Sequence, residues 1–502
     1  MKKIILILIV VNIFYINSKS YSQSTDTLRM KIDSIANVYI SDTLNSGLAI
    51  GIFRKGINTN DPPRKEMYYY GEVRKGSGIV PDSITLFKLA SIGKTLTATI
   101  LAYYVIHDPL FVKLNNPINN YFPFGQKLPY WLPDSNTVDT FKISLLDLAT
   151  HHSSIPDAPR NYVSPPHYTY AKLLEYLSSD LTSYQMRPLA YKPGTHWLYS
   201  NTGFGTLGYV LGRFSSMAYD SMQIKIFCDT LNMPDTRVFY TAGQKSRLAV
   251  GYEKGDSVPF AMVTSEGFWG AGGNFTSLHD MMNFLEWNMH LKNTTLNVLL
   301  DTLHKERTTS YNTHSWVGLA WQIDYLRDNR GPKYIWKDGG GDGYSSFICF
   351  QDSTKTGVMV LANSSKAVDA IGIDILRLLN PVQTVGIVNI STTIPEKYLL
   401  SQNYPNPFNP STKIRFDLPV PQAGITSNVK RLPDGMAGQM SNVKLIVYNA
   451  LGKRVTTLVN QVLTPGSYEV EFNAADYPSG IYFYSLSFDG NVIDKKKMVL
   501  LK

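Results

Sequence analysis

The stretch "LASIGKTLTA", from Leu89 to Ala98, places a serine and a lysine three positions apart where a loop leads into an apolar segment. We expect a helix from Ser91 onward, and residues i and i+3 are neighbours on a helix. Ser91 and Lys94 would then bring a hydroxyl and an amine together. Two further Ser-x-x-Lys copies, at 427–430 and 441–444, lie in a loop-and-strand region, where residues three apart point to opposite faces. Only the first copy, Ser91 and Lys94, therefore predicts that the serine and lysine side chains are neighbours.

The periodicity around this helix predicts an α+β fold. Strand-like runs occur at "GLAIGIF" and "EMYYYGEV", which would form a hairpin, and again at "WVGLAWQI", "YSSFICFQD" and "TGVMVLAN". Between them the chain is mostly helical or looped, as in "NTGFGTLGYVLGRF". We therefore expect one antiparallel sheet built from both ends of a domain over residues 23–381, with a helical insert folded over it.

Two local details refine this expectation. One buried stripe is predicted on the helix that follows Ser91, formed by Ile92, Leu96, Thr99 and Tyr103. A later helix, in "TSLHDMMNFLEWNM", opens with Ser277-x-x-Asp280, which is a variant of the capping box.

The composition changes after residue 381. Residues 382–397 have no helical period and are predicted to form a linker. The Pro-rich "NYPNPFNPST" follows, and then alternating strands with frequent turn signals predict a small all-β sandwich over 398–502. The stretch 424–440, bracketed by the two "SNVK" copies, is interpreted as an inserted surface loop.

The first residues predict export. "MKKIILILIVVNIFYINSKSYSQ" has two lysines, an apolar stretch and then small polar residues, which indicates a signal peptide over 1–22. The apolar stretch is too short to span a bilayer, and no later segment is long enough, so we expect no transmembrane segment in the mature chain.

Composition argues against several other classes. The formal charge is +9, but the basic residues mostly alternate with acids, and 495–497 is the only tight lysine run, so nucleic-acid binding is not expected. Cys228 and Cys349 are far apart and are interpreted as two separately buried thiols. The nine histidines form no ligand-spaced cluster, and the adjacent His151 and His152 would point in different directions. We expect no metal and no cofactor.

A serine near a lysine becomes chemically useful only under certain conditions. A serine hydroxyl is a poor nucleophile unless a base takes its proton. Lys94 could be that base only if its pKa fell far below the usual value of about 10.4, which burial and a second cation both favour. A serine at a helix N-terminus also offers its backbone N–H to a developing oxyanion. A proton relay, a second cation and a glycine-rich strand should therefore lie downstream.

All three features occur. In "PGTHWLYSNTGFGTLGYVLG", Tyr199 could relay the proton and the Asn201 amide could hold a substrate carbonyl. In "YIWKDGGGDGYSSFICF", Lys337 supplies the cation, and Gly339 and its neighbours let a ligand backbone approach closely. The N–H of Gly340 is the natural second oxyanion donor.

The order of these motifs resembles the serine β-lactamase and penicillin-binding superfamily, in particular class C β-lactamases, D-alanyl-D-alanine carboxypeptidases and esterase relatives. That family has S-x-x-K, then Y-x-N, then K-[ST]-G or H-x-G. The segments 112–123, 143–156 and 270–281 support the resemblance, which covers about residues 28–380. It implies a β-lactamase-like fold, an acyl-enzyme hydrolase and a small-molecule or peptide substrate. Its site residues would be Ser91, Lys94 and Tyr199 for catalysis and Asn201, Lys337, Gly339 and Gly340 for substrate binding.

Two positions depart from the family pattern. Asp338 stands where lactamases carry Thr or Ser, and an anion there should weaken recognition of a substrate carboxylate. Ser154 replaces the usual glycine. Keeping Lys337 rather than His favours the peptidase side. The resemblance implies an amide of a D-amino-acid peptide or a β-lactam-like substrate, and the loops at about 156–190 and 296–333 would shape the pocket. The alternatives are an esterase or transesterase of the same fold, and a non-catalytic surface binding protein on a retired hydrolase fold.

The tail resembles a different family. "LSQNYPNPFNPSTKIRFDLP", "VYNALGKRV" and the terminal strands are similar to the C-terminal sorting domain of type IX secretion substrates, over 398–502. The resemblance implies type IX secretion machinery as a partner and a location at the cell surface or in the medium.

Overall fold

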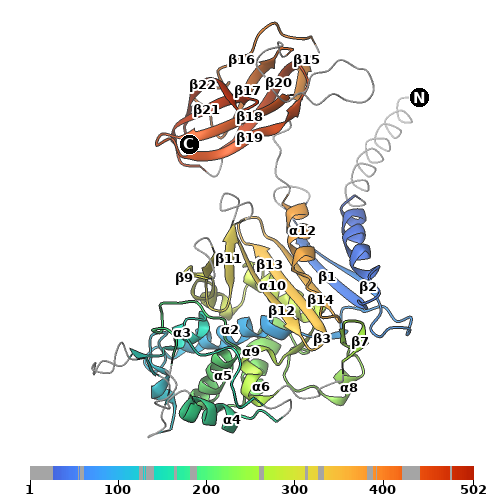
Figure 1. The fold of residues 1–502 in the computed structure, drawn as a ribbon, viewed down its shortest axis with the longest axis vertical. Helices are drawn as coiled ribbons and strands as arrows, with labels where there is room; N and C mark the ends of the chain where they lie inside the picture. The colour runs from blue at the N-terminus through green and yellow to red at the C-terminus, as the bar shows by residue number, and fades with distance from the viewer. Residues whose placement is uncertain are drawn as a thin grey trace, which may run out of the picture. The chain divides into compact units, whose positions relative to one another are not determined.

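The chain divides at residue 380: residues up to 380 form one unit and residues from 381 onward form a second (Figure 1). The structure is a computed structural model. It describes residues 27–54, 56, 61–123, 128, 130–131, 141–162, 167–180, 189–258, 265–310, 315–325, 333–380, 388–391, 393–420, 441–474 and 477–502. The predicted signal peptide and the predicted insert at 424–440 lie outside the described residues.

One eight-stranded antiparallel sheet organises the first unit, in the order β2-β1-β14-β13-β12-β11-β10-β9. Its central pairing joins the two ends of the domain, because Leu48 lies opposite Ala362. This confirms the predicted α+β arrangement. The strands are β1 (Gly47–Arg54), β2 (Arg64–Gly71), β9 (Thr308–Thr309), β10 (Trp316–Val317), β11 (Gln322–Tyr325), β12 (Lys333–Gly341), β13 (Tyr344–Gln351) and β14 (Thr356–Ala362).

The central strands are buried on both faces, as their nearly continuous apolar runs require. Along β14, Val358 and Val360 pack on a helix over residues 27–40 and on α12 (Asp369–Leu379). Met359 and Leu361, on the opposite face, join the large core that includes the helical insert. The insert contains α2 (Gly93–His107), α3 (Leu145–Ala149), α4 (Tyr170–Glu175), α5 (Asn201–Ser215), α6 (Tyr219–Gln223), α7 (Asp229–Leu231), α8 (Ala242–Lys245), α9 (Trp269–Gly272), α10 (Leu278–Asn288) and α11 (Leu300–His304).

Short elements connect these helices. Three small antiparallel pairs are formed by β3 (Leu86–Lys88) with β8 (Phe275–Ser277), β4 (Tyr130–Trp131) with β5 (Phe141–Lys142), and β6 (Tyr252–Glu253) with β7 (Asp256–Ser257). Single turns of 3-10 or π-helix occur at η1 (Ala90–Ile92), η2 (Ile118–Tyr121), η3 (Tyr176–Asp180), η4 (Ile224–Cys228), η5 (Glu266–Phe268) and η6 (Thr295–Leu299).

Helix α2 is more deeply buried than its sequence suggests. The prediction of one buried stripe was too narrow, because every residue from Gly93 to Ala102 is buried, while Tyr103 is only half-buried. Its threonines satisfy their hydroxyls by donating to backbone carbonyls, as Thr97 does to the Gly270 oxygen at 2.6 Å. Such internal bonding lets a moderately polar helix occupy the centre of the unit.

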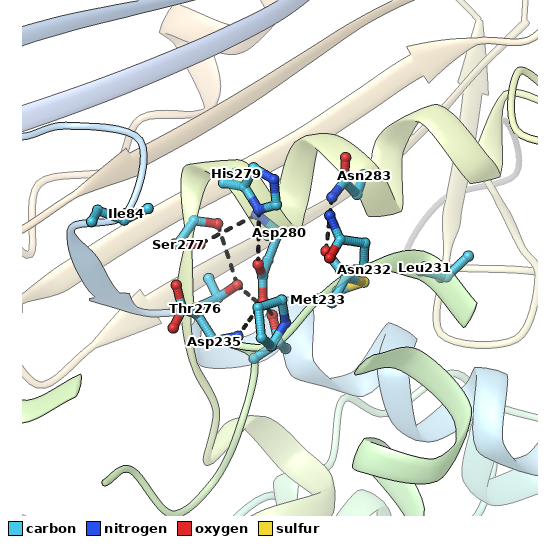
Figure 2. A network of polar contacts seen from close by, with 12 residues as sticks. Ile84, Leu231, Asn232, Met233, Asp235, Thr276, Ser277, His279, Asp280 and Asn283 are labelled. Carbon is cyan, nitrogen blue, oxygen red and sulfur yellow. Dashed lines mark hydrogen bonds and ion pairs between the residues drawn. The ribbon is translucent and has the colours of Figure 1, made fainter. Parts of the chain in front are cut away.

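The predicted capping box on α10 is only half formed (Figure 2). The Ser277 hydroxyl accepts from the Asp280 backbone N–H, as expected for an N-cap. The Asp280 carboxylate does not return the bond. Instead its Oδ2 accepts from the Asp235 N–H at 2.8 Å and from the Thr236 hydroxyl at 2.9 Å. Because this carboxylate is fully buried, its pKa is raised.

The second unit is an all-β sandwich, as predicted. Two four-stranded sheets have the orders β15-β20-β17-β16 and β19-β18-β21-β22, and side chains from both form one core. The strands are β15 (Val388–Ser391), β16 (Leu399–Leu400), β17 (Ser411–Leu418), β18 (Ser441–Asn449), β19 (Arg454–Leu463), β20 (Gly466–Asn473), β21 (Gly480–Phe488) and β22 (Asn491–Leu500).

One part of the predicted linker over 382–397 belongs to this sandwich. Residues 388–391 form β15 and pair with β20. The prediction of a linker was therefore wrong for these residues. An edge strand and a linker both lack a helical period, so only the pairing partner distinguishes them.

Two smaller predictions concern the second "SNVK" copy and the cysteines. The second "SNVK" copy lies at the start of β18, so its serine and lysine do not face each other across a helical turn. The prediction of two separately buried thiols is confirmed for Cys349, which is buried in β13, but Cys228 is only half-buried; both are free thiols.

Candidate active site

The Ser91 segment is held by a very close backbone contact. Ser91 lies in η1, and the preceding Ala90 has a φ of 50°, which is unusual for a residue with a side chain. A Cβ atom on Gly339 would lie 2.6 Å from the Leu89 carbonyl oxygen and 3.0 Å from the Ser91 nitrogen. Only glycine allows β12 to approach the serine so closely.

Lys94 lies directly behind Ser91. Its Nζ is 3.0 Å from the Ser91 Oγ, and it also donates to the Asn201 Oδ1 and to the Ala271 carbonyl oxygen, both at 2.6 Å. The lysine is completely buried. Burial lowers the pKa of Lys94, and the charge of Lys337 lowers it further, although Tyr199 acts in the opposite direction. A lysine in this setting can lose its proton well below the usual pH.

Tyr199 completes the cluster from the segment that precedes α5. Its hydroxyl is 2.6 Å from the Ser91 Oγ. The Lys94 and Lys337 ammonium nitrogens lie 4.9 Å and 5.6 Å from the centre of its ring. Burial alone would raise the pKa of Tyr199, but the charges of the two lysines outweigh burial and lower it. Ser91 thus faces two groups that can accept a proton.

Lys337 is buried but keeps its charge. Burial favours its neutral form, yet Tyr199 and Asp338 outweigh that effect and raise the pKa of Lys337. Its Nζ lies 2.7 Å from the Asp338 carboxylate. Although burial opposes ionisation of Asp338, Lys337 lowers the pKa of that carboxyl. The Lys337 ammonium group therefore already has the Asp338 carboxylate as its counterion.

Asn201 is oriented by a residue that the sequence analysis missed. Its Oδ1 faces Lys94, and its Nδ2 donates to the Asp157 Oδ1 at 2.9 Å. The same oxygen accepts the Asn201 backbone N–H at 2.8 Å. Asp157 follows Pro156 in the loop predicted to shape the pocket, but nothing in the sequence relates it to a residue 44 positions later.

A second missed residue is His151. Its ring stacks on that of Tyr199, with centroids 4.4 Å apart and an interplanar angle of 29°. Its Nδ1 accepts the Ser200 backbone N–H at 3.0 Å. Burial holds the pKa of His151 well below 6.5, so the ring is neutral. His152 points elsewhere, to the Thr308 hydroxyl at 3.1 Å, as predicted for adjacent histidines.

The departure at Ser154 has a local explanation. Ser154 has a φ of 60°, in the left-handed region that glycine adopts freely. Its hydroxyl accepts the Tyr191 backbone N–H at 2.9 Å. Serine lacks the conformational freedom of glycine, but this hydrogen bond stabilises Ser154 in the left-handed conformation.

A cavity of about 310 Å³ opens beside Ser91. Gly340 lines it, and a Cβ atom at that position would meet nothing within 4 Å. Of the two loops predicted to shape the pocket, the first contributes Asp157, Ala158 and Tyr162 to the described lining, and the second contributes no described lining residue. The lining is formed by Lys88, Ala90, Ser91, Asp157, Ala158, Tyr162, Asn201, Ser265, Phe268, Ala271, Gly272, Gly273, Gly340, Gly341 and Asp342.

The fold and this cluster define a serine hydrolase of the β-lactamase class. The β-lactamase family model matches residues 63–379, which is more than half of the chain. The chain therefore belongs to the β-lactamase family, and it is a serine hydrolase of the β-lactamase and D-alanyl-D-alanine carboxypeptidase type.

Individual relatives agree with this assignment. A β-lactamase of Pseudomonas fluorescens is 24% identical, with 67% of this chain and 94% of that protein covered. The D-alanyl-D-alanine-carboxypeptidase/endopeptidase AmpH of Escherichia coli is 26% identical, with 59% and 75% covered. Among solved structures, a D-alanine carboxypeptidase of Burkholderia cenocepacia superposes with a TM-score of 0.57 at 22% identity, covering 70% of this chain and 99% of that one. The last comparison shows the shared fold.

The second unit belongs to a different family. The model of the secretion system C-terminal sorting domain matches residues 402–500. This domain indicates type IX secretion to the cell surface or the extracellular space. No helix in the described parts of the chain combines the length and apolar character needed to cross a membrane.

Proposed function

We propose that the chain is an exported hydrolase that forms an acyl-enzyme on Ser91 and acts on an amide of a D-amino-acid peptide or on a β-lactam-like substrate. The observation that carries this proposal is the position of the Ser91 Oγ, 2.6 Å from the Tyr199 hydroxyl and 3.0 Å from the buried Lys94 amine. Export would begin with removal of residues 1–22 and end with recognition of the sorting domain by type IX machinery.

Acylation follows from the proton positions. The Lys94 and Tyr199 pair, having lost one proton, accepts the Ser91 proton as the Oγ attacks the carbonyl carbon. The negative charge that develops on the carbonyl oxygen lies near the backbone N–H groups of Ser91 and Gly340. Tyr199 then protonates the leaving amine nitrogen, and the C–N bond breaks.

In deacylation, a water molecule becomes the nucleophile and Ser91 becomes the leaving group. A water molecule gives its proton to the same pair and attacks the ester carbon, and Ser91 regains its proton as the acid leaves. Asn201 is proposed to hold a substrate carbonyl with its amide, and Lys337 to provide positive charge beside the reacting groups.

The Lys337–Asp338 ion pair favours a second candidate, an esterase or transesterase. A cation that already has a counterion attracts a substrate carboxylate less strongly. An ester without a carboxylate would not suffer this loss. A retired, non-catalytic fold is disfavoured, because the contacts among Ser91, Lys94 and Tyr199 are all present.

A hydrolysis panel distinguishes these candidates. It contains a D-Ala-D-Ala peptide, a chromogenic cephalosporin and a short-chain nitrophenyl ester, and it is run beside labelling by penicillin-type and fluorophosphonate probes. The proposal expects cleavage of the peptide or the cephalosporin, with labelling of Ser91. Cleavage of the ester alone would favour the esterase, and a protein that reacts with no substrate and no probe would contradict both.

A further inference from the structure

The charges around the cavity do not balance. Lys337 is paired with Asp338, and Lys88 is paired with Asp342. The Lys94 and Tyr199 pair carries no net charge once it has lost one proton. Among the described residues that line the cavity, this leaves Asp157 as the carboxylate outside any ion pair.

The Asp157 carboxylate is accessible to a ligand. The residue is exposed, and both hydrogen bonds that it accepts, from the Asn201 backbone and side chain, use Oδ1. Its Oδ2 accepts no bond from the described residues. A carboxylate oxygen has lone pairs that can accept hydrogen bonds, so Oδ2 is free of the bonds that hold Oδ1 to Asn201.

Two aromatic side chains, Tyr162 and Phe268, form one wall of the same cavity, which we call the aromatic wall. Their ring centroids lie 5.8 Å apart, and Phe268 stacks on the buried Tyr168 at 5.1 Å. Tyr168 therefore holds the wall in place. Aromatic faces attract cations, and a carboxylate beside them strengthens that attraction.

A buried hydroxyl without a described partner belongs to a residue in the wall of this cavity. Ser265 lines the cavity and is only 3% exposed, yet its Oγ has no hydrogen-bond partner among the described residues. Leaving a buried polar group unsatisfied is energetically unfavourable, so such groups are usually satisfied by another group or by water.

We infer that this cavity selects substrates whose acyl part carries an ammonium group, which Asp157 and the aromatic wall would bind. This inference rests on the proposed function, because it assumes that the acyl part lies beside Asn201. It also differs from recognition of a substrate carboxylate by Lys337, since Asp338 already neutralises that cation.

The test uses three D-alanyl p-nitroanilides that differ only at the amino group: the free ammonium form, the neutral N-acetyl form and the anionic N-succinyl form. The kcat/KM ratio of the ammonium to the acetyl substrate is compared between the wild type and Asp157→Asn. Asparagine can still accept the Asn201 bonds through its carbonyl oxygen, so the variant removes the charge and keeps the contact. Because both substrates use the same active site, any general loss of activity cancels in the ratio.

The expected result is a fall of about three- to tenfold in this ratio for Asp157→Asn, and a rise in relative activity toward the succinyl substrate. The control is Asp352→Asn, which makes the same change in net charge at a partly exposed surface ion pair that does not line the cavity. It should leave the ratio unchanged. If turnover is too slow to measure, the same ratio is taken from protection of Ser91 against a fluorophosphonate probe.

Equal ratios in the wild type and Asp157→Asn would overturn the inference while leaving the proposed function intact. Absence of any labelling at Ser91 would instead contradict the proposed function, and the inference would fall with it. A ratio that falls equally in Asp352→Asn would show a long-range charge effect and would also overturn the proposed subsite.

Discussion

The Ser91 hydroxyl contacts both Lys94 and Tyr199, and the pKa of each of these two groups is lowered. Burial is the main cause for the lysine, whereas neighbouring cations are decisive for the tyrosine. Because the two groups are strongly coupled, their titration belongs to the pair and not to either residue.

We predict that Ser91→Ala lowers kcat by at least ~10³-fold, because catalytic groups of this kind act as a unit. The fold should survive, since Ser91 is only half-buried and alanine is smaller. The measurement is steady-state hydrolysis together with intact mass after an acylating inhibitor. Ser246→Ala, on the surface near α8, is the matched control. A mass shift that persists in Ser91→Ala would place the nucleophile elsewhere.

Lys337→Ala should move the ascending limb of the kcat/KM–pH profile to higher pH. The Lys337 charge lowers the pKa of both Lys94 and Tyr199. Without it the pKa of the pair rises, so the free base is populated only at higher pH.

Asp338→Thr should move the same limb in the opposite direction. Removing the carboxylate leaves the Lys337 charge uncompensated, and that charge then depresses the pKa of the pair more strongly. Substrates that bear a carboxylate should also improve. Superimposable profiles for the wild type and both variants would mean that residues 337–339 form only a structural part of the strand.

His151→Phe tests a positioning role. Phenylalanine keeps an aromatic ring on Tyr199 but removes the acceptor for the Ser200 N–H. We expect kcat to fall about tenfold through misplacement of Tyr199. The pH profile should not move, because the pKa of His151 lies well below 6.5 and the ring is neutral throughout the active range. A shifted limb would show that His151 itself titrates during catalysis.

At the scale of single elements, β12 and η1 depend on each other. Gly339 brings the strand against the backbone of the Ser91 segment, and a Cβ there would also meet the Ser346 hydroxyl oxygen at 2.5 Å. Neither Leu89 nor Ser91 can move away without displacing the proposed nucleophile, since Ala90 already holds a left-handed conformation.

Gly339→Ala should therefore reduce kcat more than it reduces thermal stability. We expect a loss of about 10²-fold in kcat, because displacement of about 1 Å at a catalytic group has effects of that size. The control is Gly243→Ala in α8, where an added Cβ would meet nothing within 4 Å. Unchanged kinetics in Gly339→Ala would show that η1 tolerates the displacement.

At the scale of the whole molecule, the two units have separate cores. Side chains of the sandwich form one cluster, and those of the first unit form two others around the large sheet. Each unit can therefore bury its own apolar surface.

A chain truncated after Asn380 should fold and keep the kcat/KM of the full-length enzyme. Thermal unfolding and hydrolysis kinetics provide the measurements, and residues 388–502 expressed alone should fold as the complementary control. If the truncated enzyme unfolds or loses activity, the hydrolase requires the C-terminal domain for folding, and that domain is more than a sorting signal.

The sequence by itself determined the elements and the order of the motifs. Alternating strands, helical periods and the three motifs around Ser91, Tyr199 and Lys337 are local patterns, and each depends on residues a few positions apart. They were sufficient to predict the α+β sheet built from both ends of the first domain and the terminal sandwich.

Only the tertiary structure decided which side chains meet. The stacking of His151 on Tyr199 and the bonds from Asn201 to Asp157 join residues more than forty positions apart. The burial of α2 on all sides and the pairing of residues 388–391 with β20 likewise depend on what packs against them. No local pattern encodes such contacts, because they arise from the shape that all the elements form together.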